Sequence, residues 1–405
     1  YPSNYKKNII IKNLNKIRLK KNFFIFHAGT KYKNNSLIST GGRVLNVSGL
    51  GNDFLNINNG KRNRFDIYGQ LDSLWSESWV TSIGARLGIV QTDADDVHGY
   101  NQTNMMGSNQ KADSDAFNAS KKKQTDENID VSLLTRYNMK ENSSIELGYT
   151  MKTRSPNLYQ RYTWSTWTMA ANMNNLYGDG NGYVGDIDLD SETAHKVGLV
   201  LDHQDANKNW SIKINPYYTY IDDYIDANVI SDRADGYRNL KFANQSARIY
   251  GLDVGADMHL FETLKFGDFN LLGKFNYQKG RNADADTNLY NMMPPNLTVG
   301  INQNMGSWKN TLSMLLVDEK DNVNSTRQER ETAGFTKFDF ITSYQWKSLS
   351  IIGEVENIFD KNYADPLGGE YLGQGATMST GINRADGTQV PGIGRSFNVA
   401  LSYRF

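Results

Sequence analysis

Alternation of apolar and polar residues with a period of two is the feature that most constrains how this chain folds. In RFDIYGQLDSLW, Phe65, Ile67 and Leu71 share one parity, whereas Asp66 and Asp72 share the other. Successive side chains of a β-strand point to opposite faces, so this segment is predicted to form a strand with one apolar face. SWVTSIGARLGIVQTD follows after a short turn and supplies an antiparallel partner.

The same paired unit recurs along the chain and predicts a meander of antiparallel strands. The further pairs are NIDVSLLTRYNM with SSIELGYTMKTRSP, KVGLVLDHQD with WSIKINPYYTYIDDYI, ARIYGLDVGADMHLF with DFNLLGKFNYQKGR, NLTVGINQNM with WKNTLSMLLVDEK, and KFDFITSYQW with LSIIGEVENIF. A separate strand is expected at 237–244. Several connections are only a few residues long, whereas others are long and polar (92–126, 155–192, 282–291, 318–334 and 360–395). Short turns at one end of a meander and long loops at the other are the layout of a membrane-spanning β-barrel.

Hydropathy and composition fit this layout. The mean hydropathy is −0.60, and no run approaches the roughly eighteen apolar residues of a transmembrane helix. A barrel that alternates apolar-out with polar-in has the average hydropathy of a soluble protein. Aromatic residues close to predicted strand ends suit an interfacial aromatic belt; they are Trp75, Trp79, Trp210, Tyr217, Tyr218, Trp308 and Trp346. The alternative is that such residues pack the core of a soluble β-sandwich, whose strands are shorter.

Cysteine and charge counts narrow the class of protein. The chain has no cysteine, which excludes a disulfide, a thiolate metal site and a cysteine nucleophile. Residues 1–52 hold ten Lys or Arg and no Asp or Glu, so the rest holds 34 basic and 44 acidic residues, a net charge of −10. That acidic main part argues against a nucleic-acid partner. We treat residues 1–60 as an atypical basic segment, either a surface arm or a fragment boundary, and residues 61–405 as the barrel region.

Three motifs in order resemble TonB-dependent outer-membrane receptors. They are ANQSARIYGLDVGA at 243–256, ENIFDKNYADPLGG at 356–369 and the terminal GRSFNVALSYRF. The stretch 151–195 is also similar to the central barrel region of that family, although Gln160 and Asp186 stand where Glu and Asn are usual. The resemblance covers roughly residues 61–405.

The resemblance implies a fold, a location and partners. It implies an all-β, antiparallel up-and-down transmembrane barrel in the bacterial outer membrane. Nothing before Lys61 reads like a plug domain, so we expect the C-terminal strands of a larger plugged barrel. Implied partners are the TonB system acting through a plug, outer-membrane lipid and the barrel-assembly machinery; we also expect a monomer. That machinery would read the C-terminal strand through Phe397, Val399, Leu401, Tyr403 and Phe405.

Two sets of long-loop residues are candidates for ligand binding. Arginine and aromatic side chains together suit an anionic, aromatic ligand such as a ferric siderophore; they are Arg154, Tyr159, Arg161, Tyr162, Trp164 and Trp167. Girdle anchoring and interstrand pairing are the alternative roles. Methionine thioethers suit Cu(I), and the methionines concerned are Met105, Met106, Met169, Met173, Met292 and Met293. The alternative is that they fill irregular loop packing.

The segment YGDGNGYVGDIDLD, residues 177–190, is a candidate calcium site in an extracellular loop. Its oxygen ligands would come from Asp179, Asn181, Asp186, Asp188 and Asp190. As an EF-hand loop it fails, because the fifth and sixth positions hold Tyr and Val where a ligand and a Gly are required. A plain Gly/Asp turn is the alternative.

The expected function is receptor-mediated uptake of a scarce nutrient, either a ferric siderophore or another metal complex. No cofactor is required, since any metal complex would be cargo. Alternatives are a passive porin-like channel and a surface β-rich adhesin or glycan-binding protein. The five histidines are scattered, and the sequence has no Gly-x-Ser-x-Gly, His-Glu-x-x-His or phosphate loop, so an enzyme is not expected.

Overall fold

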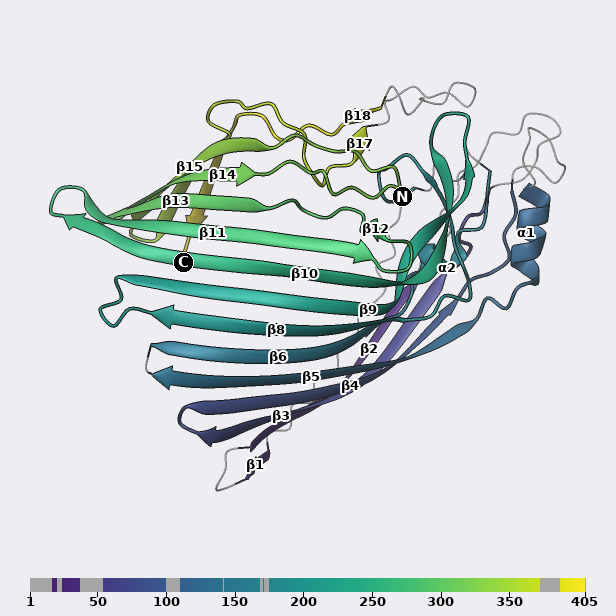
Figure 1. The fold of residues 1–405 in the computed structure, drawn as a ribbon, viewed down its shortest axis with the longest axis horizontal. Coiled ribbons are helices and arrows are strands. Elements are labelled where there is room, and N and C mark those ends of the chain that lie inside the picture. The colour runs from purple at the N-terminus through teal and green to yellow at the C-terminus, as the bar shows by residue number, and fades with distance from the viewer. Residues whose placement is uncertain are drawn as a thin grey trace.

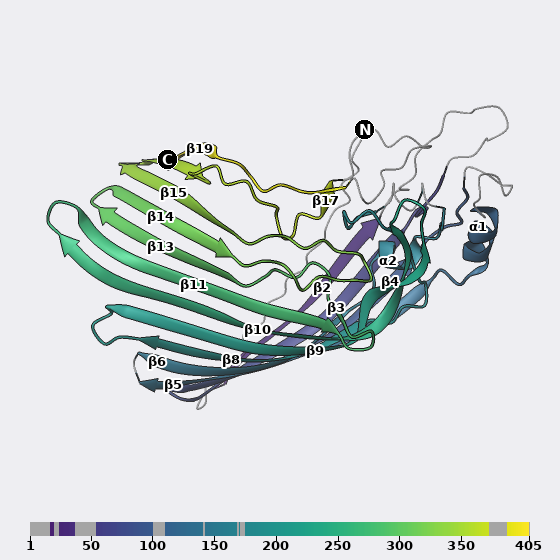
Figure 2. The same ribbon diagram turned by 45° about the horizontal axis from the view of Figure 1, so that its top comes forward.

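A wide antiparallel sheet that curves around a hollow side dominates the fold (Figures 1 and 2). The computed structural model describes residues 17–19, 24–36, 54–99, 110–140, 142–167, 170, 175–371 and 387–404. The long strands are β2 (Phe24–Ser36), β3 (Lys61–Ser76), β4 (Trp79–Asp93), β5 (Gln124–Lys140), β6 (Ser143–Arg154), β8 (Glu192–Gln204), β9 (Trp210–Asp232), β10 (Arg238–Thr263), β11 (Gly267–Asn282), β13 (Asn296–Met305), β14 (Trp308–Val317), β15 (Phe335–Trp346), β16 (Leu349–Glu356) and β19 (Ser396–Tyr403).

The remaining elements are short and lie mostly in the connections. They are the strands β1 (Ile17–Leu19), β7 (Gly182–Val184), β12 (Thr287–Asn288), β17 (Glu370–Tyr371) and β18 (Thr388–Gln389), and the helices α1 (Gln110–Ala119) and α2 (Leu158–Tyr162). Across the described part of the chain, the helices are too short or too polar to cross a membrane.

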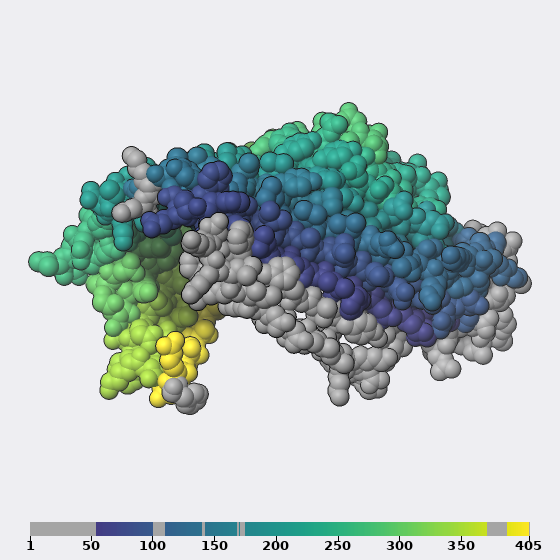
Figure 3. All heavy atoms as spheres, turned by 90° about the horizontal axis from the view of Figure 1, so that it is seen from below, coloured from purple at the N-terminus to yellow at the C-terminus, as the bar shows by residue number. Residues whose placement is uncertain are grey.

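Each long strand pairs antiparallel with the next long strand along the chain, from β2 through to β19. The predicted all-β, up-and-down architecture is therefore confirmed. Within the described residues the sheet stays open, since β19 registers with β16 and no register joins β19 to β2. In the space-filling view the wall arches over a hollowed face (Figure 3).

The two faces of the wall differ as the period-two pattern predicts. Ile67, Leu87 and Ile129 pair in register across β3, β4 and β5, and their side chains are 52%, 59% and 49% exposed on the convex face. Asp66 and Asn128, on the opposite face, are buried. An apolar outer face and a polar inner face are the pattern of strands that meet lipid outside and a lumen inside.

Exposed aromatic residues gather where the short turns are. Trp75, Trp79, Tyr137, Trp308 and Trp346 all lie at that end of their strands and are exposed. Trp79 stands opposite Tyr137 in the register. Their placement in one belt matches the expected interfacial girdle rather than a buried sandwich core. Tyr217 and Tyr218 are not in this belt, because they lie in the middle of β9.

One expected element is wrong. Residues 237–244 do not form a separate strand, because 238–244 are the first part of β10. They pair with the outer part of β9, and bulges at 239–240 and 245–247 shift the register between the two strands. The two strands thus continue past the rim as one paired arm, seen at the right of Figure 1. Local alternation cannot show that a strand on either side of a bulge is continuous.

The C-terminal strand has the predicted alternation. Phe397, Val399, Leu401 and Tyr403 on β19 are 59–77% exposed and face outward. They stand opposite β16, with Phe397 beside Val355 and Leu401 beside Ile351. Phe405 lies outside the described residues. Recognition of this strand by the assembly machinery stays a prediction.

Candidate functional site

The long connections meet at one end of the sheet and share a hydrophobic core. We call this unit the loop cap; it comprises residues 54–60, 94–99, α1, α2 with the described residues after it as far as 191, and the outer parts of β9 and β10 (Figure 2). Its core side chains are Phe54, Ile57, Ala94, Val97, Phe117, Tyr159, Tyr162, Trp164, Ala170, Tyr183, Leu189, Ile225, Ala227, Leu240 and Phe242. Side chains from distant loops therefore fix one another in place.

Helix α2 is a short capped turn that begins just beyond the rim of the sheet. Pro156 precedes it, and the Asn157 side chain accepts a bond from the Gln160 backbone N–H while the Gln160 side chain accepts one from Asn157 N–H. This reciprocal capping box satisfies two of the free donors at the helix start. It also aims the next two side chains, Arg161 and Tyr162, into the cap.

The Arg161 guanidinium has three partners inside the protein. Its side chain is 2% exposed, and its Nη2 lies 2.6 Å from an Asp126 carboxylate oxygen. Its Nη1 donates to the Thr92 hydroxyl at 2.9 Å, and Nη2 donates to the Leu189 carbonyl at 2.9 Å. Arg161 therefore ties α2 to strands β4 and β5, and its charge is neutralised within the fold.

The neighbouring aromatics are packed in the same way. Tyr162 is completely buried and donates to the Lys122 carbonyl at 2.7 Å; burial raises its pKa to about 12. The Trp164 indole N–H donates to the Leu55 carbonyl at 2.8 Å, and its ring stacks on Phe54 at 5.3 Å. Tyr159 contacts Phe242 edge-on. These rings build the cap.

Arg154 and Trp167 complete the predicted siderophore set. Arg154 binds both oxygens of Glu192 at 2.5 Å and has a half-exposed side chain, while Trp167 packs partly buried against the cap core. The structure thus places five of the six predicted residues in the loop cap and Arg154 beside it at the end of β6, where it donates to Gln160 of α2; most of the six have packing roles. Direct ligand contact by this set stays a prediction, and the sequence could not show that Arg161 has an acidic partner 35 positions away.

A second buried arginine was not singled out from the sequence. Arg327, in the connection 318–334, is 4% exposed and pairs with Asp226 of β9 at 3.0 Å. Its Nη1 donates to the Tyr183 hydroxyl at 2.9 Å. The guanidinium carbon lies 4.8 Å from the ring centre of Tyr177, 5.2 Å from that of Tyr183 and 5.1 Å from that of Tyr290.

We call these five residues the arginine junction. They come from the β9–β10 arm and from the loops 155–191, 283–295 and 318–334, so one guanidinium links four segments. Burial raises the pKa of Tyr290 and of Tyr183, and both remain neutral phenols that face the cation with their rings. Removing the charge would leave Asp226 buried without its cation.

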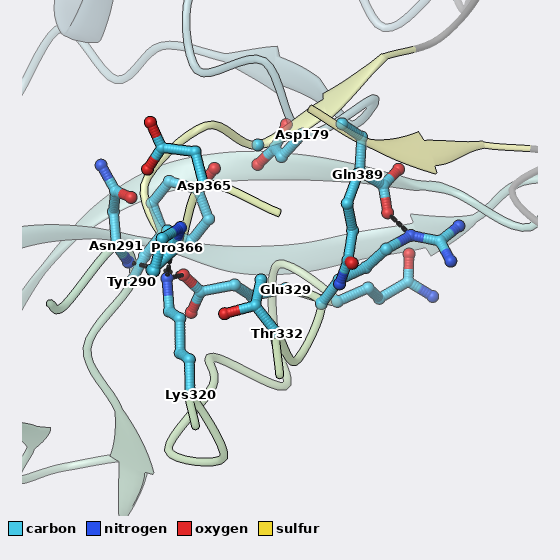
Figure 4. Close-up of a pocket in the computed structure, with 13 residues that line it drawn as sticks. Asp179, Tyr290, Asn291, Lys320, Glu329, Thr332, Asp365, Pro366 and Gln389 are labelled. Atoms are coloured by element: carbon cyan, nitrogen blue, oxygen red, sulfur yellow. Dashed lines mark hydrogen bonds and ion pairs between the residues drawn. The ribbon is translucent and has the colours of Figure 1, made fainter. Parts of the chain in front are cut away.

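Beside the junction lies a small polar cavity (Figure 4). It is lined by charged side chains that are already paired: Lys320 lies 2.5 Å from Glu329 and also donates to the Pro366 carbonyl, while Arg330 pairs with Glu370. Its volume is about 20 Å³, room for about one water molecule. It is far too small for a metal complex in this state.

A larger cavity opens on the concave face, below the loops. We call it the inner cavity; it has a volume of about 240 Å³ and is lined by Tyr217, Asp253, Asn276, Tyr277, Gln278, Met293, Pro294 and Asn296. Strand register assembles it, because Asp253 stands opposite Asn276, and Tyr217 stands opposite Gly251. An ideal Cβ on Gly251 would lie 2.5 Å from the Tyr217 hydroxyl, so glycine is what lets that ring lie there.

The polar groups of the inner cavity are held in place by one another. Asn276 donates to Asp253 at 2.8 Å, and the Lys196 ammonium lies 4.4 Å from the centre of the Tyr217 ring. Apolar and aromatic walls with a few fixed polar groups are typical of small-ligand pockets. In the sequence, these residues are marked only by their place on the inward-facing side of the alternation in β9, β10 and β11. That pattern locates a cavity only once the register between the strands is known.

Of the predicted methionines, Met105, Met106, Met169 and Met173 lie outside the described residues. Met292 packs against Leu289 and the neighbouring core. Both Met292 and Met293 line a cavity of about 80 Å³, and Met293 also lines the adjoining inner cavity. Of the two, Met293 is the one that lines the inner cavity. A metal role for the set stays a prediction.

The side chains of three predicted calcium ligands have partners within the chain. Asp179 accepts bonds from Tyr183 and Asn175, Asn181 donates to the Arg327 carbonyl, and Asp186 lies 2.8 Å from the Lys241 ammonium. Over the described ranges, no group of three or more His, Asp or Glu side chains is arranged to hold a metal ion. Calcium in this loop stays a prediction.

A comparison with protein families decides the class. The family model described as TonB dependent receptor-like, beta-barrel matches residues 11–358, which is most of the chain. This chain belongs to the TonB-dependent receptor family. The match begins at residue 11, so it includes most of the basic segment 1–60, which we had set apart on its composition.

Solved structures of this family share the fold. The copper transporter OprC is 16% identical with a TM-score of 0.67, covering 94% of this chain and 54% of that one. The FrpB iron transporter from Neisseria meningitidis is 14% identical with a TM-score of 0.61, covering 96% and 54%. The ferric-catecholate import receptor Fiu from K12 E. coli is 13% identical with a TM-score of 0.61, covering 97% and 53%.

The chain thus spans about half the length of these receptors. Short stretches are also similar to phosphoribosylamine–glycine ligases, 37% identical over 54 residues in Caldanaerobacter subterraneus and 42% identical over 48 residues in Brucella melitensis. Those matches cover 13% and 12% of this chain, too little to carry a ligase fold. The family and its structural neighbours are transporters and receptors.

Proposed function

We propose that this chain forms the barrel wall and loop cap of an outer-membrane receptor that takes up a metal complex, with a ferric siderophore as the leading cargo. Family membership supports a receptor role, and similar structures include ferric-catecholate, ferric yersiniabactin and ferric enterobactin receptors. The outer membrane is the proposed location, because those neighbours are outer-membrane proteins. The protein would act as a monomer, without a catalytic cofactor and without enzymatic activity.

The observation that carries this proposal is the inner cavity beneath the loop cap. Its Tyr217 ring offers a stacking surface with Lys196 beside it, and Asn276 and Gln278 offer hydrogen bonds. An anionic chelate with aromatic groups would use stacking, charge and hydrogen bonding together. The cavity lies on the lumenal side of the loops, so cargo bound there would already have passed the cap.

Transport would then follow the order of the architecture. Loops of the cap would first admit the complex, and the cavity on the concave face would hold it. Release inward would need energy from the TonB system, acting through a plug domain; both partners are implied by the family. A passive channel would instead move solutes without that energy.

The proposal is tested by binding to the purified protein in detergent. We expect a ferric catecholate siderophore to bind with micromolar or better affinity, and Tyr217→Ala with Asn276→Ala to weaken binding about tenfold or more. Tyr218→Ala is the matched control, because Tyr218 is the next residue and lies exposed on the opposite face. Equal binding by all three proteins would remove the inner cavity from the proposal.

Copper is a second candidate cargo, favoured by the position of Met293 on the inner cavity. Cu(I) prefers soft thioether ligands. Met293→Leu preserves volume and removes the sulfur, so it should weaken Cu(I) binding while ferric-complex binding stays unchanged. Met258→Leu, on the exposed convex face, is the control.

A further inference from the structure

The hairpin between β10 and β11 reaches further than its neighbour at the short-turn end. The register of β10 with β9 ends where Met258 stands opposite Trp210, yet β10 continues to Thr263. Figures 1 and 2 show this hairpin extending beyond the other turns at the left. We call residues 260–266 the hairpin tip.

The hairpin tip is apolar, unlike the other short turns. Leu264 is 112% exposed, and Phe261, Phe266 and Leu260 are 52%, 51% and 38% exposed. Corresponding turns carry polar or small residues, such as Glu77–Ser78, Asn207–Lys208 and Gly306–Ser307. Contiguous exposed apolar residues on a hairpin indicate a surface that is covered by a partner.

The tip continues the lipid-facing band of the wall. Ile301 stands opposite Leu271, and Leu271 stands opposite Met258, in one outward row. The next outward pair toward the tip is Phe269 with Phe261, whose ring centres lie 4.8 Å apart. The apolar surface therefore runs without a polar break from the barrel wall to the tip.

Charges on the hairpin are sorted between its two faces. Glu262 stands opposite Asp268 on the inward face, and Asp268 pairs with His259 at 2.8 Å. Lys265 is at the tip itself, with its ammonium 5.1 Å from the Phe266 ring centre. Apolar side chains with an adjacent cation suit the phosphate-bearing headgroup layer of a membrane.

We propose that the hairpin tip lies in the headgroup layer of the leaflet at the short-turn end, with Leu264 and Phe266 inserted among the lipids and Lys265 against their phosphates. The inference rests on the proposed membrane location. Its occupant is lipid rather than a soluble protein, because the apolar surface is continuous with the lipid-facing band.

The chain has no cysteine, so single-cysteine spin labels report on chosen positions without background. Leu264→Cys is labelled in vesicles of phosphatidylethanolamine and phosphatidylglycerol, and collisions with oxygen and with an aqueous nickel chelate are compared. Asn207→Cys serves as the exposed-turn control and Leu87→Cys as the lipid-band control. Phe266→Cys repeats the test should labelling at Leu264 disturb folding.

The tip labels are expected to give an oxygen-to-nickel collision ratio at least about twofold above that of the Asn207 label, and below that of the Leu87 label. A tip ratio equal to that of Asn207, with Leu87 in lipid, would overturn the inference alone and leave the tip free for a soluble partner. A Leu87 label exposed to the nickel chelate would overturn the membrane location and the inference with it.

Discussion

Buried arginines show how single residues hold the loop cap together. Arg161 and Arg327 each join segments far apart in sequence, to Asp126 and Asp226 respectively. The sequence singled out Arg161 as a candidate ligand-binding residue. It could not show that Arg161 is buried in the cap, because its partner Asp126 lies on a distant strand. Arg327 carried no local signal, since its acid is 101 positions away and its aromatic partners come from two other loops.

Arg327→Met should loosen the loops 283–295 and 318–334 from the loop cap without unfolding the wall. The substitution leaves Asp226 buried and unpaired, which costs about 3–5 kcal/mol. Hydrogen exchange of the loops 283–295 and 318–334 should accelerate, while exchange in the strands β3–β6 stays slow. Asp226→Asn in the same chain should recover part of the loss.

Arg395→Met is the control for that change, because Arg395 is half-exposed and lies 3.9 Å from its partner Asp360. Such surface pairs contribute little. Equal loop exchange in Arg327→Met and the parent protein would show that the junction does not hold these loops to the loop cap.

Ionisation of the buried Tyr162 phenol should destabilise the cap at high pH. Burial raises its pKa from 10 in the unfolded chain to about 12 in the folded one. Its contribution is therefore fully present below pH 10 and is lost as pH rises through 12, by about 3 kcal/mol in total. Cap proteolysis followed from pH 9 to 12 should rise over that window. Tyr162→Phe should reduce the rise, because other buried tyrosines such as Tyr183 and Tyr290 also have raised pKa values and keep part of it. A profile identical to that of the parent protein would show that Tyr162 makes no contribution.

At the scale of elements, alternation predicted most strands of the wall and the distribution of long and short connections. It failed at β10, because a bulge changes the parity inside one continuous strand. It also could not locate the inner cavity, since Tyr217, Asp253 and Asn276 meet only through cross-strand register. Loop packing was inaccessible to sequence reasoning, because it depends on contacts between segments with no common period.

The same alternation makes a prediction about the two faces of one hairpin. Leu87→Arg places a charge on the convex apolar band and should destabilise the folded barrel in lipid by about 2–4 kcal/mol. Gln70→Arg, on the concave side of the adjacent strand, should be tolerated because lumenal positions meet water. Urea unfolding in vesicles separates the two, and equal losses would contradict the assignment of faces.

For the whole molecule, three features belong together. The wall has an apolar outer face and a polar inner face, the loops at one end form a cap with its own core, and a cavity lies on the inner face below the cap. A receptor needs this order, with capture outside and passage inside. The all-β class and the family followed from sequence patterns, whereas the residues that would meet cargo emerged only from the fold.

Uptake of radiolabelled iron, supplied as a ferric catecholate siderophore, tests the receptor proposal most directly. The complete gene is expressed in a host that lacks its own catecholate receptors. Three proteins are compared: the parent, the double variant Tyr217→Ala with Asn276→Ala, and the control Tyr218→Ala. We expect uptake by the parent and control proteins that stops when a protonophore removes the TonB energy source, and a loss of about tenfold in the double variant. Uptake that persists with the protonophore, and is equal in all three proteins, would contradict the proposal and indicate a passive channel.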